Sequence, residues 1–315
     1  MAKYMLKRVL SAIPTLFGII LVVFVLMRVV GGSPAQYMLE EDATQEEIDA
    51  LEAQLGLDKP IWEQFVVYCK DVLTGNWGNS YFNREPVFNN IVARLEPTIL
   101  ITVCSTIITV CIGIPAGIMA ATHRNSPLDY AISTASIGFM SIPNFWMGMM
   151  MVYFLGWKLG IFPVQGYHSI AKYGLMEAVW YVAMPSLMLG LSHVAGLARQ
   201  TRSYMLDVLN EDYIRTARAK GLSVFKIRYK HALKNTLSMV STMIATSVIA
   251  MLGGSTIAEN VFNINGIGKF AYDSLMRRDY SQEQAILLYM SLLYIGLNIV
   301  MDILYKLIDP RVDFS

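Results

Sequence analysis

The residues of this sequence that could recognise a charged partner are concentrated in residues 211–235, which read EDYIRTARAKGLSVFKIRYKHALKN. The arginine and lysine side chains of this stretch can pair with carboxylates or phosphates on another molecule. Apolar sequence begins close by on both sides. The stretch is therefore too confined to fold as an independent domain, and we interpret it as a docking surface carried by its apolar neighbours.

Residues 211–235 are patterned as two short helices around a glycine. Ile214 and Ala217 would share one face of the first helix. Gly221 follows at the position where a left-handed backbone costs little only for glycine, and Ser223 can cap the second helix. Along one side of that second helix we expect Val224, Ile227 and His231.

Three kinds of partner fit such a basic pair of helices. DNA is one, because the pattern resembles a helix-turn-helix, but the adjoining apolar segments leave no separate domain, and we expect no nucleic-acid partner. Anionic lipid is the second, and some attraction to a membrane surface is expected in any case. A cytosolic protein is the third, since a rigid pair of short helices joined to two membrane helices can transmit a movement of that protein to the membrane helices.

The sequence lacks the residue patterns of catalysis. It has no G-x-x-x-x-G-K-[ST] phosphate loop, because Gly266-Ile267-Gly268-Lys269 is followed by Phe270. It also has no H-E-x-x-H and no G-x-S-x-G. We expect no catalytic residue, no metal and no cofactor in this chain, so that ATP and Mg²⁺ would be bound by a partner. No ligand spacing is found among the histidines, His123, His168, His193 and His231.

Two residues within apolar segments are candidates for a translocation path. His193 is an ionisable group inside such a segment, which makes it either a functional residue or a satisfied packing residue. Asn144 follows Pro143, which is expected to interrupt its helix, as is Pro115 in an earlier segment. A break of this kind marks either a pathway or a packing kink, and the sequence leaves both alternatives open.

The elements that must position these residues are apolar helices. Apolar residues make up 55% of the 315 residues and charged residues only 16%, which is typical of membrane proteins. We therefore expect an all-α polytopic membrane protein, with one transmembrane domain over residues 1–315. Six segments can each cross about 30 Å of hydrocarbon as a helix: residues 9–30, 97–121, 130–157, 179–199, 236–258 and 284–307.

The distribution of charge predicts the orientation of these helices. Basic residues favour the cytoplasmic side, and they are concentrated in residues 1–8, 122–129, 200–235 and 308–315. Residues 31–96 instead concentrate acidic side chains. Both termini and the 211–235 stretch are therefore expected in the cytoplasm.

The outer segment 31–96 is patterned as helices rather than as a linker. Thr44 and Glu47 have the spacing of a capping box, and Gly56 would end the helix that they begin. A second helix would start at Asp58-Lys59-Pro60 and end at Thr74-Gly75, and a third would cover residues 86–95. This segment either packs over the membrane helices or receives a partner or substrate. In the last outer loop, 259–283, a short amphipathic helix is expected after Gly266 and Gly268.

The 211–235 stretch resembles the coupling motif of bacterial ABC importer permeases, which reads EAA, three residues, Gly, nine residues, then Ile-x-Leu-Pro. Gly221 takes the glycine position and Ala217 the second alanine, while Arg215 and Thr216 replace the glutamate and first alanine. His231-Ala232-Leu233-Lys234 replaces Ile-x-Leu-Pro. These departures are similar to the oligopeptide, dipeptide and nickel permease branch, which reads close to YxRTARAKG…HALxN.

The resemblance to that branch extends over nearly the whole chain. The start, LKRVLSAIPTLFGIILVVFVLMRVVGGSPA, is similar to the first helix of the branch, although Gly31-Gly32-Ser33-Pro34 stands where Pro-Gly-Asp-Pro is more usual. GNWGNSYFNREPVFNNI resembles its outer segment. The last outer loop matches at Glu259, Phe262, Gly266, Gly268 and Arg278-Asp279-Tyr280.

The resemblance implies a type I ABC importer permease in the bacterial inner membrane, with six transmembrane helices and a cytoplasmic coupling helix. It implies a second homologous permease subunit, two cytosolic ATPases that bind ATP and Mg²⁺, and an extracytoplasmic binding protein, all beside membrane lipid. The implied cargo is di- or oligopeptides, with nickel or a metal chelate as the alternative. The residues implied to contact the ATPases are Asp212, Tyr213, Arg215, Thr216, Ala217, Lys220, Gly221, His231 and Leu233.

Two other classes of protein compete with this interpretation. A self-contained channel or secondary transporter would need paired charges or rings of acidic residues within its spans, and these spans are nearly free of both. A membrane scaffold would work without ATP.

Overall fold

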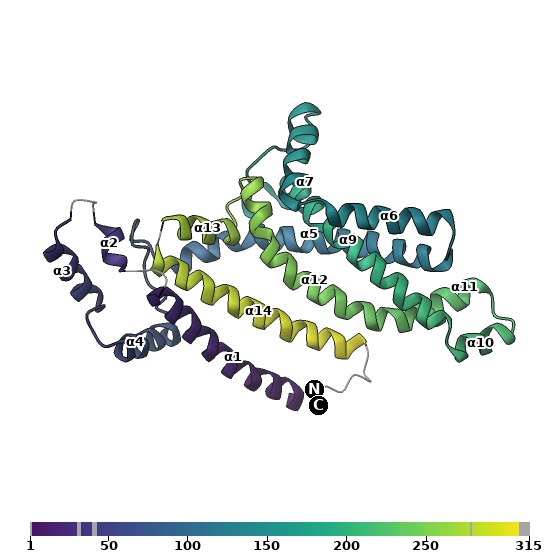
Figure 1. Ribbon diagram of the computed structural model, residues 1–315, viewed down its shortest axis with the longest axis horizontal. Coiled ribbons are helices and arrows are strands. Elements are labelled where there is room, and N and C mark those ends of the chain that lie inside the picture. The colour runs from purple at the N-terminus through teal and green to yellow at the C-terminus, as the bar shows by residue number, and fades with distance from the viewer. Residues whose placement is uncertain (1, 30–32, 40–42, 278, 309–315) are drawn as a thin grey trace. The chain divides into compact units, whose positions relative to one another are not determined.

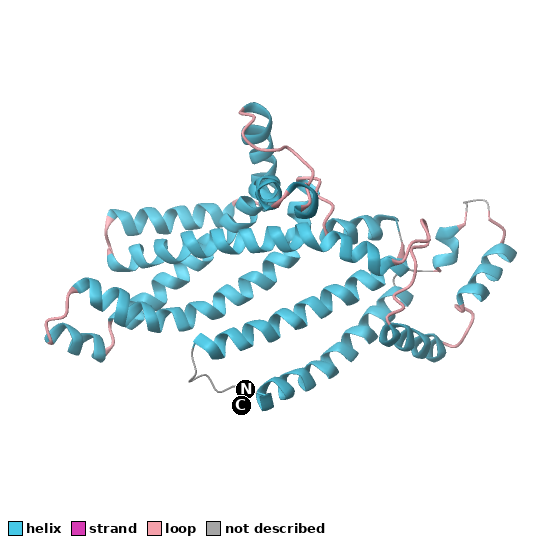
Figure 2. Cartoon of the chain, turned by 180° about the vertical axis from the view of Figure 1, so that it is seen from behind, coloured by secondary structure: helices cyan, strands magenta, loops and turns pink. Residues whose placement is uncertain are grey.

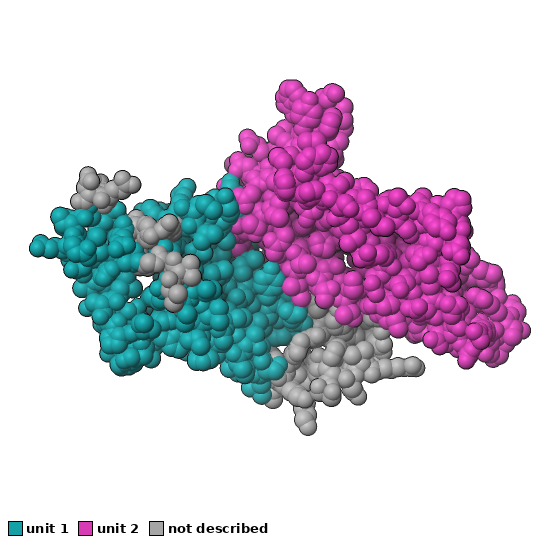
Figure 3. Space-filling model, in the orientation of Figure 1, with its two compact units in different colours: residues 1–95, 269–299 teal, residues 96–268, 300–315 magenta. Residues whose placement is uncertain are grey.

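The computed structural model describes residues 2–29, 33–39, 43–277 and 279–308. Within these ranges the regular elements are helices joined by loops and turns (Figure 2). The chain forms two compact units, coloured separately in Figure 3. Unit 1 comprises residues 1–95 and 269–299, and unit 2 comprises residues 96–268 and 300–315. Three parts of the sequence discussed above lie outside the described residues: Gly31-Gly32, Arg278, and residues 309–315 of the C-terminal segment expected in the cytoplasm.

Unit 1 is held together by aromatic packing between its first helix and its outer segment. The Phe24 ring lies 5.2 Å from the Phe65 ring and 5.8 Å from the Tyr68 ring, measured between centroids. Arg28 Nε donates a hydrogen bond to Gln64 Oε1 at 2.9 Å. The helices of unit 1 are α1 (Ala2–Val29), α2 (Pro34–Met38), α3 (Gln45–Leu55), α4 (Ile61–Thr74), the start of α5 (Val87–Thr122), most of α13 (Ile267–Arg277) and most of α14 (Tyr280–Ile308).

The expected helix ends of the outer segment are confirmed. The Thr44 side chain and Glu47 form the reciprocal capping box at the start of α3, and Gly56 ends that helix with φ of 68°. Gly75 ends α4 with φ of 76°. The separate third helix over residues 86–95 is wrong, because α5 runs without interruption from Val87 to Thr122. Pro97 and Pro115 lie inside α5, so the expected interruption at Pro115 is also wrong.

Unit 2 is built around α9 (Leu175–Leu209). Met188 and Leu189 of α9 are buried with Ile101 of α5, Met147 of α7 and Met251 of α12 in one apolar core. The other elements of unit 2 are α6 (Pro127–Ser141), α7 (Asn144–Met151), the π-helical turn η1 (Val152–Lys158), α8 (Ile170–Tyr173), α10 (Asp212–Ala219), α11 (Val224–Lys226), the π-helical turn η2 (Ile227–Ala232) and α12 (Leu233–Val261).

The helices that can cross a membrane correspond to the six expected spans, with one exception in shape. Five helices of the described chain are long and apolar enough to span, namely those containing Leu10–Arg28, Val87–Thr122, Leu175–Leu209, Met239–Val261 and Tyr280–Val300. The expected span 130–157 is not a single straight helix. It is broken at Pro143 into α6 and α7–η1, which are bent by 95° (Figure 1).

Candidate functional site

Helix α10 is attached to unit 2 by one apolar face, as its sequence pattern predicts. Ile214 and Ala217 are buried in a cluster with Ile118 of α5 and Met205 of α9. Ile227 and Ala232 of η2 complete the same cluster. Figure 1 shows α10 and α11 together at the ends of α9 and α12. Two long helices and this short one therefore share a single core.

The turn after α10 has the hydrogen bonds of a Schellman motif. Gly221 N–H donates to Arg218 O at 2.9 Å, and Leu222 N–H donates to Ala217 O at 3.3 Å. Gly221 has φ of 73°, which confirms its predicted left-handed conformation. Ser223 accepts a hydrogen bond from Lys226 N and caps the next helix, also as predicted.

The second helix of the 211–235 stretch is not a separate short helix. Residues 224–261 form one continuous helical path through α11, η2 and α12, so the turn at Gly221 is joined directly to an apolar span. Ile227 is buried as expected. The expected alignment of Val224 with it is wrong, because Val224 is 61% exposed. Val224 lies in the first turn of this helix, directly after the cap at Ser223, where it has no buried neighbour among the described residues to pack against.

Two polar contacts fix the stretch, and sequence reasoning did not find either. Asn235 Nδ2 donates to the Tyr213 hydroxyl at 2.7 Å, which ties α10 to α12. Arg228 Nη2 donates to the Thr122 carbonyl at 3.2 Å, at the end of α5. Their partners lie 22 and 106 residues away in the sequence, beyond the reach of any helical periodicity.

The exposed face of this site is polar and lies beside a small patch of two aromatic side chains. Asp212 and Arg215 form an ion pair at 3.2 Å between side chains that are 93% and 72% exposed, so the pair adds little stability. The rings of Phe225 and Tyr229 lie 4.6 Å apart on the exposed side of the second helix. Among the predicted contact residues, Tyr213, Thr216, Lys220 and Gly221 are exposed, while His231 and Leu233 are half-buried.

A buried ion pair, which the sequence did not reveal, joins α6 to α9. Arg202 Nε and Nη2 donate to the two oxygens of Asp129 at 2.6 and 2.7 Å. Asn125 N–H donates to the same carboxylate at 3.0 Å. The Asp129 side chain is 3% exposed and that of Arg202 28% exposed. The only sequence signal was an acidic residue in the first turn of a helix, which usually marks a helix terminus rather than a tertiary contact.

The two candidate path residues lie in unit 2 but share no recorded interaction within the described chain. Asn144 is the first residue of α7, directly after the break at Pro143, and is half-buried. His193 is half-buried and its Nδ1 lies 2.9 Å from the Leu189 carbonyl of its own helix. Within the described ranges, no group of three His, Cys, Asp or Glu side chains is placed to hold a metal ion.

The glutamate of the last outer loop is buried in a close contact with a glycine. The Thr98 hydroxyl donates to Glu259 Oε1 at 2.6 Å and accepts from Ile267 N–H at 2.9 Å. A Cβ on Gly266 would lie only 2.2 Å from Glu259 Cδ. Any larger residue at 266 would therefore displace the carboxylate.

Comparison with known families places this arrangement. Residues 113–314 match the family described as binding-protein-dependent transport system inner membrane component, and residues 1–102 match its N-terminal family. The chain belongs to this family. The permease is 38% identical over the full length of both chains to a probable peptide ABC transporter permease protein, y4tP, of Sinorhizobium fredii. It is 35% identical to the oligopeptide transport system permease protein AppB of Bacillus subtilis, again over both full lengths.

A third relative and a solved structure agree with this assignment. The glutathione transport system permease protein GsiC of Escherichia coli strain K12 is 38% identical over the full length of both chains. The fold matches an inward-facing structure of the MetNI methionine ABC transporter with a TM-score of 0.60 and 19% identity, covering 71% of this permease and 98% of that chain. The expected family, the type I permease fold and the multi-pass inner-membrane location are thereby confirmed. The chain is a permease subunit of an ABC importer.

Proposed function

We propose that this permease carries di- or oligopeptides across the inner membrane, together with a second homologous permease subunit. Two cytosolic ATPases would supply the energy by binding ATP and Mg²⁺, and an extracytoplasmic binding protein would deliver the peptide. The relatives named for peptide, oligopeptide and glutathione transport support this cargo. ATP-dependent uptake of peptide by the complete importer in proteoliposomes tests this proposal.

The uptake experiment compares labelled peptides of two to five residues with nickel and a nickel chelate. We expect saturable uptake of peptide that stops when ATP is withheld. Uptake of nickel without uptake of any peptide would contradict the peptide assignment and favour the alternative cargo.

The observation that carries the proposed coupling is the attachment of α10. Its buried face, Ile214 and Ala217, shares a core with the ends of α5 and α9, while its other side is exposed. Force applied to the exposed side would therefore be passed to the membrane helices through this packed core. We assign the ATPase contact to Asp212, Tyr213, Arg215, Thr216, Ala217, Lys220, Gly221, His231 and Leu233. Of these, Ala217 is buried and would contribute by holding α10 in place.

The exposed pair Phe225 and Tyr229 extends this proposed contact surface. Aromatic side chains beside charged ones are typical of the anchors that dominate protein interfaces. The pair lies on the helix that continues into α12. A partner bound to α10 would thus also contact Phe225 and Tyr229, whose helix continues directly into the membrane span of α12.

Cross-linking tests the ATPase contact. A Thr216→Cys variant, made after replacing Cys69, Cys104 and Cys111, is expected to cross-link to an ATPase subunit in the assembled importer. A Lys158→Cys variant at the end of η1 serves as control and is expected to give no such product. Absence of the product from Thr216→Cys in an importer that still hydrolyses ATP would sink the assignment.

Asn144 and His193 remain candidates for the translocation path. Asn144 lies at the sharpest break among the spanning helices, where backbone polar groups can face a cavity. The contact of His193 with its own helix favours a packing role for that ring. Peptide uptake by Asn144→Ala and His193→Phe variants distinguishes a path role from a packing role. We expect the first variant to change the Michaelis constant for peptide and the second to leave it unchanged.

A further inference from the structure

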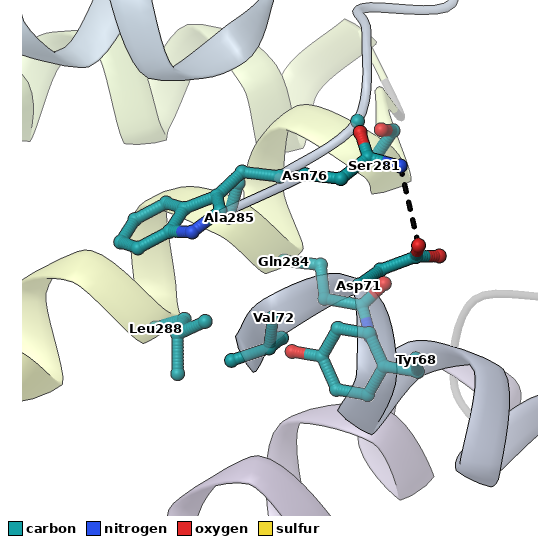
Figure 4. A pocket seen from close by; sticks show the side chains of 10 residues that line it. Tyr68, Asp71, Val72, Asn76, Ser281, Gln284, Ala285 and Leu288 are labelled. Carbon is teal, nitrogen blue, oxygen red and sulfur yellow. Dashed lines mark hydrogen bonds between the residues drawn. The ribbon is translucent and has the colours of Figure 1, made fainter. Parts of the chain in front are cut away.

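Unit 1 contains a cavity of about 150 Å³ that lies in a different unit from the coupling segment. It lies between α4 and the first turns of α14, and residues 76–78 form part of its wall (Figure 4). This volume is many times the roughly 10–15 Å³ needed by one water molecule. The cavity is thus large enough for a single amino-acid residue.

The cavity presents two buried hydrogen-bonding groups whose bonding capacity the surrounding side chains do not fill. The Tyr68 hydroxyl and the Gln284 amide nitrogen are both buried, and neither makes a hydrogen bond of normal geometry within the described residues, although the two side chains lie close enough to interact with each other. Burial raises the pKa of Tyr68 to about 12, so its hydroxyl is protonated at neutral pH and can donate. Buried polar groups without partners are rare and indicate a missing ligand or water. Both groups can donate to an oxygen atom.

A carboxylate lies in the same wall. Asp71 Oδ1 accepts a hydrogen bond from Asn76 Nδ2 at 3.2 Å, drawn as the dashed line in Figure 4, and no other side-chain partner of Asp71 is recorded in the described chain. The Trp77 and Tyr68 rings also line the cavity, and aromatic faces attract cations. Arg28, which could repel a cation, is hydrogen-bonded to Gln64 and lies over the Phe24 ring, outside the lining.

The lining therefore suits a ligand with a positive charge and a hydrogen-bond acceptor close together. The amino end of a peptide has this chemistry, since its ammonium and its first carbonyl oxygen are carried by adjacent atoms of one residue. The ammonium of a lysine side chain has no acceptor beside it, so it would leave Tyr68 and Gln284 unsatisfied. Val72, Ala285 and Leu288 provide the apolar wall for a small side chain.

We propose that this cavity binds the amino-terminal residue of a peptide, with the ammonium at Asp71 and the first carbonyl oxygen at Gln284 and Tyr68. The inference rests on the proposed import of peptides. It adds a peptide subsite on the permease itself, formed by the outer segment 31–96 together with α14.

Calorimetric titration of the assembled importer in nanodiscs, without its binding protein, tests the proposal. The probes are Ala-Ala and N-acetyl-Ala-Ala, which differ in the ammonium group. We expect Ala-Ala to bind, and the acetylated form to bind at least about tenfold more weakly. Asp71→Asn should weaken Ala-Ala binding by a similar factor while leaving the acetylated form unaffected, because the two changes remove the same contact.

Control variants make the result specific to the cavity. Glu63→Gln changes a carboxylate on the same helix that does not line the cavity, and it should bind Ala-Ala as the wild type does. Gln284→Leu should weaken both probes, because both carry the carbonyl.

Two outcomes would overturn the inference. They are no saturable binding of Ala-Ala, and equal binding of Ala-Ala and N-acetyl-Ala-Ala. If the wild-type importer takes up peptide in proteoliposomes but fails these tests, only the subsite is rejected. Failure of peptide uptake itself would reject the proposed function.

Discussion

At the scale of single residues, the proposed coupling surface depends on a backbone conformation rather than on a side-chain contact. Gly221 has φ of 73°, and a Cβ added there would meet nothing within 4 Å. The requirement for glycine is therefore conformational and not a matter of space. Asparagine tolerates this conformation better than other residues with a side chain, whereas β-branched residues tolerate it poorly.

We expect Gly221→Val to loosen the turn after α10 by about 1–2 kcal/mol and to reduce co-purification of the ATPases by about tenfold or more. Gly221→Asn should retain most of the assembly. Gly196→Val, at an α9 glycine with open space and no positive φ, provides the matched control. Equal assembly for all three variants, measured by the ATPase content of the purified complex, would refute a role for this turn.

The pair Asp129 and Arg202 supports the same region from the side of α6. Asp129→Asn would leave a partly buried guanidinium without its counter-ion, and we expect a loss of roughly 2–3 kcal/mol in the free energy of unfolding. Replacing both residues by leucine should cost less than the single change, because no charge is left unpaired. Thermal unfolding of the purified complex measures both variants, and a double variant at least as destabilised as Asp129→Asn would contradict this expectation.

At the scale of elements, the apolar face of α10 determines whether it acts as a rigid attachment. Ile214→Ala removes a fully buried side chain and should weaken the attachment by about 2–4 kcal/mol. Hydrogen exchange of the amides in Asp212–Ala219 is therefore expected to accelerate by roughly 30-fold or more. The exposed neighbour change Arg215→Ala should leave exchange almost unaltered, and similar acceleration by both variants would contradict this account.

Local sequence signals predicted the ends of several helices correctly. They did not predict which helices continue without interruption. The capping box at Thr44, the glycines at 56 and 221 and the cap at Ser223 were correct because each acts within a few residues. Proline was a poorer guide. Pro143 breaks its span, but Pro97 and Pro115 lie within α5, since neighbouring helices can compensate for a lost backbone hydrogen bond.

At the scale of the whole molecule, hydrophobic length and basic residues predict the order and direction of the spans. Cysteine accessibility in intact cells checks this. With the native cysteines replaced, single cysteines at Gln45 and Glu63 should react with a membrane-impermeant maleimide. Cysteines at Thr216 and Lys230 should react only after permeabilisation, and reaction of the latter two in intact cells would reverse the predicted orientation.

The sequence predicted the class of protein and the turn at Gly221 but not the contacts that hold residues 211–235 in place. The spans follow from hydrophobicity, which every residue of a segment contributes to. The bonds from Asn235 to Tyr213 and from Arg202 to Asp129 join residues 22 and 73 positions apart. Such pairs depend on which helices become neighbours, and no pattern within one helix reports that.

The length of α9 has a mechanical consequence. Its 35 residues form a rod of about 52 Å, whereas the hydrocarbon layer is about 30 Å thick. A tilt of about 10° about one end would move the other end by about 9 Å, by the geometry of a rod of this length. A lever of these proportions converts a small rocking motion inside the bilayer into a stroke comparable to the diameter of a helix.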